Sequence, residues 1–116
     1  MGTWDEDIFT NEVNVEFLDD LASMDSEDIV EAVRDAIVLA AEGAVSEDEI
    51  ANAQAAATIA AIWSGAPFSA GDVVSNYPFI RGLVGSSDEE LNEKAAQILE
   101  DVDADYDLEV FIEALA

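Results

Sequence analysis

The placement of charge constrains the fold of this chain more than any other feature. Of the 116 residues, 28 are acidic and only three are basic, namely Arg34, Arg81 and Lys94. Residues 1–49 hold 16 of the acids and residues 88–116 hold 11, while residues 50–87 contain only Asp72, balanced by Arg81. A neutral middle third between two acidic thirds is expected either to be buried or to bind another molecule.

Composition favours one globular domain over residues 1–116 without catalytic chemistry. Apolar residues make up 51% of the chain, which is enough to offset the entropy of ordering it. The chain has no cysteine and no histidine, so it lacks disulfides, thiolate ligands and the usual near-neutral general base. No phosphate loop or cofactor fingerprint is present either. We therefore predict that the protein is not an enzyme and holds no cofactor.

The N-terminal region and the longest apolar run predict a cytoplasmic protein. Acids at positions 5–7 stand where a secretion signal has basic residues. The run from Ile50 to Trp63 is too short to span a bilayer, and Asn52 and Gln54 interrupt it. We interpret this run as a buried helix, and we expect no membrane association.

Apolar residues at helical spacing predict an all-α bundle of four to five helices. The first follows a cap at Thr10 or Asn11 and includes Val13, Phe17, Leu18 and Leu21; the others cover about 25–43, 46–64, 87–102 and 108–115. Capping boxes at Ser46 with Glu49 and at Ser87 with Glu90 mark two of the starts. Glycines and prolines break residues 66–86 into an irregular connection.

Two details of this bundle are further expectations. In the third helix, one face is predicted to pack against the core: Ile50, Ala53, Ala57, Ala60 and Ala61. In the second, Val38 and Leu39 lie beside the main apolar stripe, so the end of that helix is expected to be covered on more than one side.

The start of the chain carries a short motif of aromatic and small residues: Met1, Gly2, Thr3 and Trp4, then Phe9 and Asn11, followed by Phe17, Leu18 and Leu21. It resembles a bacterial family of small proteins catalogued as domain of unknown function 4259. This chain has Asp5 where the family often has glycine, and Ile8 and Thr10 flank Phe9 in place of a Gly-Pro-Phe-Asp-Asn run. The resemblance implies a fold class and no functional residue. Independently, Trp4 and Phe9 are expected to anchor the N-terminal segment to the helices.

Alternating acids near the C-terminus are the candidate for a metal site: Asp101, Asp103, Asp105, Asp107 and Glu109. A calcium loop needs glycine at its sixth position and glutamate at its twelfth, where this chain has Tyr106 and Ile112. We interpret the run as a solvated segment that collects cations weakly, and we predict no specific metal site.

The acidity has several possible meanings. We favour an interaction module for a basic protein partner, of the inhibitor or immunity type, that contacts it through an acidic helix face or through Phe68, Tyr77, Phe79 and Arg81 in the neutral third. The alternatives are a stand-alone protein adapted to salt and a mimic of a nucleic-acid backbone. Direct nucleic-acid binding is disfavoured, and the oligomeric state stays open. Crowded like charges also predict raised carboxyl pKa values.

Overall fold

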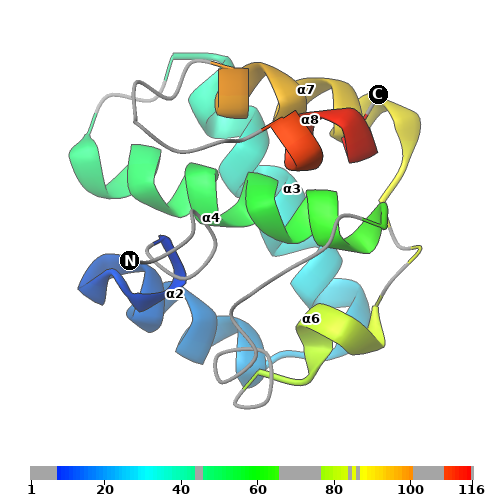
Figure 1. Cartoon of the computed structure of the whole chain (residues 1–116). Coiled ribbons are helices and arrows are strands. Elements are labelled where there is room, and N and C mark those ends of the chain that lie inside the picture. Colours follow the sequence, from blue (N-terminus) through cyan, green and yellow to red (C-terminus); the bar gives the residue numbers. More distant parts are fainter. Residues whose placement is uncertain are drawn as a thin grey trace.

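The computed structural model describes residues 8–43, 46–65, 77–83, 85, 87–100 and 109–115, apart from the side chains of Arg81 and Val110. These residues form six helices and no strand (Figure 1). The helices are α2 (Glu12–Ala22), α3 (Ser26–Ala41), α4 (Glu47–Trp63), α6 (Phe79–Gly82), α7 (Glu89–Glu100) and α8 (Glu109–Leu115). The predicted all-α class is confirmed.

Helix α4 is the centre of the fold. It contacts α2, α3, α6, α7 and α8. In Figure 1 it crosses the middle of the molecule, with α7 and α8 on one side, α2 and α6 on the other, and α3 behind. Every residue from Ala55 to Trp63 is buried, as is Ala53. A helix that is covered on all sides must be apolar all round, which explains why this segment carries no charge. Its alanines let the surrounding helices approach closely.

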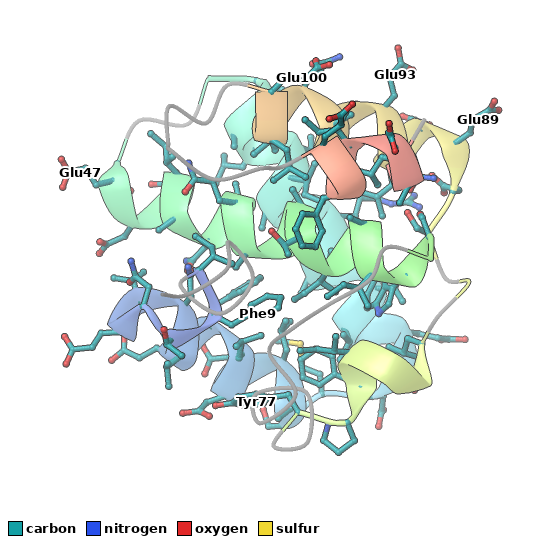
Figure 2. All side chains as sticks on the ribbon, viewed as in Figure 1. Phe9, Glu47, Tyr77, Glu89, Glu93 and Glu100 are labelled. Atoms are coloured by element: carbon teal, nitrogen blue, oxygen red, sulfur yellow. The ribbon has the colours of Figure 1, made fainter. Side chains whose placement is uncertain are left out.

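The surrounding helices bury one stripe and expose the other. Their buried apolar residues are Leu18 and Leu21 of α2, Ile29, Val33 and Ile37 of α3, Leu91, Ala95, Ile98 and Leu99 of α7, and Phe111 and Leu115 of α8. Acids occupy the opposite faces, and Figure 2 shows Glu47, Glu89, Glu93 and Glu100 pointing away from the molecule. Within the described ranges, no helix combines the length and apolarity needed to cross a bilayer.

The segment before α2 is anchored as predicted at Phe9, which is 1% exposed; Trp4 lies outside the described residues. Asn14 supports this anchor in a way that periodicity did not indicate. Its side chain is fully buried, and Nδ2 donates to the carbonyl oxygen of Ile8 at 2.7 Å. Of the two predicted caps, Asn11 occupies the N-cap position and accepts from the Val13 amide at 3.0 Å.

The predicted start and end of α4 are confirmed. The Ser46 hydroxyl oxygen accepts from the Glu49 amide at 3.1 Å, and Gly65 follows the helix with a φ of 107°. A φ in this region is strained for any residue with a Cβ, so glycine suits the position.

The predicted cap of α7 is wrong by one residue. Asp88, not Ser87, accepts from the Leu91 amide, at 2.8 Å. The Ser87 hydroxyl instead donates to Oδ1 of Asn92, and the Ser64 hydroxyl donates to the same oxygen at 3.0 Å. The Gly85 amide also donates to the carbonyl oxygen of Trp63 at 2.8 Å. Ser87 is therefore used to join the end of α4 to the start of α7.

Two predicted core positions are also wrong. Ile50 is 42% exposed because it lies in the first turn of α4, before the helix enters the core at Ala53. Leu39 is 49% exposed, so it does not widen the buried stripe of α3, whereas Val38 is half-buried and lies beside α7. Ala57, Ala60 and Ala61 are fully buried as expected.

Candidate interaction surface

Residues 77–83 contain the part of the predicted interaction segment that the structure describes. Tyr77 and Phe79 are half-buried, and their rings meet edge to face with centroids 6.2 Å apart and planes at 63°. Ile80 is fully buried and packs the segment against the core. Phe68 and the side chain of Arg81 lie outside the described residues. The role of these aromatics in binding stays a prediction.

A hydrogen bond ties this segment to α2. The Tyr77 hydroxyl donates to Oδ1 of Asp19 at 2.5 Å, across 58 positions of sequence. The Asp19 carboxylate holds the phenolic proton and so raises the pKa of Tyr77 above its usual value, with smaller contributions from desolvation and from the charge of Asp19. Figure 2 places Tyr77 on the side of the molecule where α2 and α6 lie.

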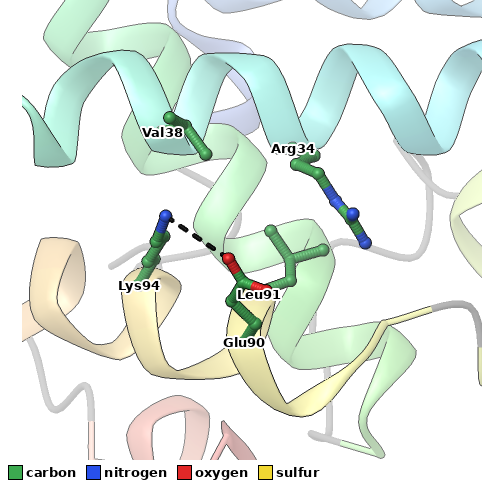
Figure 3. A pocket seen from close by; sticks show the side chains of 5 residues that line it. All are labelled: Arg34, Val38, Glu90, Leu91 and Lys94. Carbon is green, nitrogen blue, oxygen red and sulfur yellow. Dashed lines mark ion pairs between the residues drawn. The ribbon is translucent and has the colours of Figure 1, made fainter.

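Two of the three bases lie along the seam between α3 and α7. Arg34 and Val38 of α3 face Glu90, Leu91 and Lys94 of α7 across a shallow depression (Figure 3). The depression has a volume of about 20 Å³, which is room for roughly one water molecule. It is too small to hold a substrate or cofactor.

Both bases at this seam are paired with acids of the same chain. Nη2 of Arg34 lies 2.5 Å from Oδ2 of Asp88, and Nζ of Lys94 lies 3.7 Å from Oε1 of Glu90 one turn earlier on α7. The hydrogen bond from the Leu91 amide and the nearby Arg34 guanidinium lower the pKa of Asp88, although desolvation opposes them. The expected rise in carboxyl pKa is therefore wrong at Asp88, because the Leu91 amide and Arg34 stabilise its ionised form by more than desolvation opposes it.

The predicted acidic run of Asp101, Asp103, Asp105 and Asp107 lies outside the described residues. Within the described part of the chain, no three carboxylates gather in a way that could hold a metal ion. The metal prediction is thus not tested at the position where it was made.

Sequence comparison places the chain in a family. The model of the family described as Domain of unknown function (DUF4259) matches residues 2–111. The chain belongs to this family. The match covers nearly the whole chain, from Gly2 to Phe111, so the DUF4259 unit includes α2, α3, α4, α6 and α7 and ends in the first turn of α8. Comparisons with curated proteins and with solved structures found no match. The DUF4259 description names no activity, so it transfers no functional residue to this chain.

Proposed function

We propose that this DUF4259 protein is a protein–protein interaction module that binds a basic partner. The observation that carries the proposal is how the few bases are used. Arg34 and Lys94 are paired within the α3–α7 seam. The exposed acids of α2, such as Glu12, Glu16 and Asp20, have no ion-pair partner in the described part of the chain. Their charge is free to act on another molecule.

Such a surface supports fast and selective association. Clustered carboxylates attract a basic protein over distances of about a Debye length and raise the association rate. Charge contributes less to the lifetime of a complex, which depends on buried apolar or aromatic side chains. The half-buried pair Tyr77 and Phe79 supplies candidates for that role, together with Phe68 and Arg81 from the same neutral segment. An inhibitor or immunity protein that captures a basic enzyme needs both properties.

The test is affinity capture with the purified protein from a lysate of the organism that encodes it. Capture is performed at low salt and again at about 0.5 M salt, where the Debye length falls to about 4 Å. A basic protein that is retained at low salt and released at high salt, in a fixed stoichiometry with this chain, is the expected result. Absence of a partner at any salt would favour the alternative that the acidity serves only solvation.

A variant that removes charge without changing shape tests the role of the α2 acids. Replacing Glu12, Glu16 and Asp20 by their amides removes charge from an exposed helix face without changing its size. Capture should weaken, and its dependence on salt should decrease. A different result would identify the chain as a mimic of a nucleic-acid backbone. In that case the captured protein has a groove that normally binds a nucleic acid, and adding that nucleic acid releases the captured protein from this chain.

A further inference from the structure

The end of α3 carries an apolar side chain that the rest of the described chain leaves uncovered. Leu39 is 49% exposed, the largest value among the exposed large apolar residues, Met24, Leu39 and Ile50. A single exposed leucine is ordinary. What distinguishes Leu39 is its surroundings on the helix.

Leu39 lies between two acids, Asp35 of α3 and Glu42, the residue that caps the C-terminus of α3. Side chains three and four residues apart on a helix are neighbours, so Asp35 and Glu42 flank Leu39 along the helix axis. Both acids are exposed, and neither has an ion-pair partner in the described residues. Arg34, the only base on α3, is paired with Asp88 at the seam with α7.

This combination selects one kind of occupant. The exposed leucine side chain is stabilised by contact with an apolar side chain of a partner. The carboxylates on both sides of it favour a partner whose apolar residue has cations on both sides. A second copy of this chain is disfavoured, since each copy has a formal net charge of −25. Asp35, Leu39 and the C-cap residue Glu42 are four and three positions apart, and a partner helix with the same spacing of residues can contact all three.

We propose that Leu39 and Asp35 of α3 and the C-cap residue Glu42 form a docking surface for a basic amphipathic helix of another protein. The proposal rests on the proposed function and adds to it the place of contact and the kind of segment bound. This surface is formed by the end of α3 and its C-cap residue, and so differs from the residue 77–83 segment considered above.

The test uses a synthetic helical peptide of alanine and lysine. The peptide carries one leucine, with lysines four residues before it and three after it, and a matched peptide carries alanine instead of that leucine. Binding of both peptides to the wild-type protein and to Leu39→Ala is measured by calorimetry at low salt, which forms a double-mutant cycle. We expect Leu39→Ala to weaken the affinity for the leucine peptide about tenfold. The two peptides should bind that variant with equal affinity.

Control variants keep the outcomes separate. Ile50→Ala removes another exposed apolar side chain from a different helix and should leave binding of the leucine peptide unchanged. Thermal unfolding checks that Leu39→Ala is folded. If the leucine peptide binds but Leu39→Ala binds it as tightly as the wild type, the α3 surface is wrong while the proposed function stands. If neither peptide binds the wild-type protein at low salt, the α3 surface is wrong, and the lysate capture described above decides the proposed function separately.

Discussion

Asp88 shows how one residue can serve several purposes. Its Oδ1 accepts from the Leu91 amide at the start of α7, and its Oδ2 lies 2.5 Å from Nη2 of Arg34 on α3. A sequence window reveals the first possibility, because aspartate is a good N-cap. The second depends on residues 54 positions apart and follows only from the way in which α3 packs against α7.

The lowered pKa of Asp88 predicts a specific dependence of stability on pH. A carboxyl whose pKa is lower in the folded protein than its ordinary 3.8 stabilises the fold above that value. This stabilisation is lost as the pH falls through the folded pKa. Asp88→Asn retains an oxygen that can cap the helix but removes the charge. It should be less stable than the wild type at neutral pH, and urea unfolding should show the difference shrinking under acid. A difference that is independent of pH would contradict this account.

Tyr77 provides a second prediction at the scale of single residues. Its hydrogen bond to Asp19 raises its pKa, so its contribution to stability is present below the ordinary value of 10.0 and is lost as the pH rises through the folded pKa. Replacing Asp19 by asparagine should lower the pKa of Tyr77 toward 10.0. Absorbance titration under alkali measures this directly in a Tyr106→Phe background, where Tyr77 is the single remaining tyrosine. An unchanged titration would show that the hydrogen bond to Asp19 does not control Tyr77.

At the scale of helices, much of the fold could be predicted from periodicity and capping. The ends of α4 followed from Ser46, Glu49 and Gly65, and its burial followed from the absence of charge. The exposure of Ile50 and Leu39 could not be predicted, because both have the same apolar chemistry as core residues. Whether another helix covers an apolar side chain depends on where the neighbouring helices begin and end in space. A local sequence pattern does not contain that information.

The buried alanines of α4 predict that added volume will be costly. Ala57 is fully buried in the helix that all the other described helices contact. Ala57→Leu should overpack this centre and lower the free energy of unfolding by about 1 to 3 kcal/mol. Ala41→Leu, at the exposed last residue of α3, adds the same side-chain atoms with little effect and is the control. Denaturant unfolding measures the free energy of unfolding of both variants. Equal values would show that the side chains around α4 rearrange to accept the added volume at little cost.

At the scale of the whole molecule, candidate sites were harder to predict than the fold. The neutral third was interpreted either as buried or as a binding segment, and the described residues show both a buried α4 and a half-buried aromatic pair, Tyr77 and Phe79. Function depends on which molecule the surface binds. Acidity alone is compatible with a solvated surface, with recognition of a basic partner and with mimicry of a nucleic-acid backbone. Separating these meanings requires a measurement in which they give different results.

The dependence of stability on salt is such a measurement. The surface area is 6336 Å², and an even spread of the 28 acids of the sequence over it would place neighbouring carboxylates about 15 Å apart. The Debye length is about 30 Å at 0.01 M salt, about 8 Å at 0.15 M and about 3 Å at 1 M. Screening of ordinary surface repulsion should therefore raise the melting temperature mainly below about 0.15 M sodium chloride and change it little above that concentration.

Sucrose at matched osmolality controls for effects of solute other than screening, and chloride avoids the added stabilisation by sulfate. A melting temperature that continues to rise steeply toward molar chloride would contradict this prediction. It would favour a protein adapted to high salt, whose acids serve solvation rather than the capture of a basic partner.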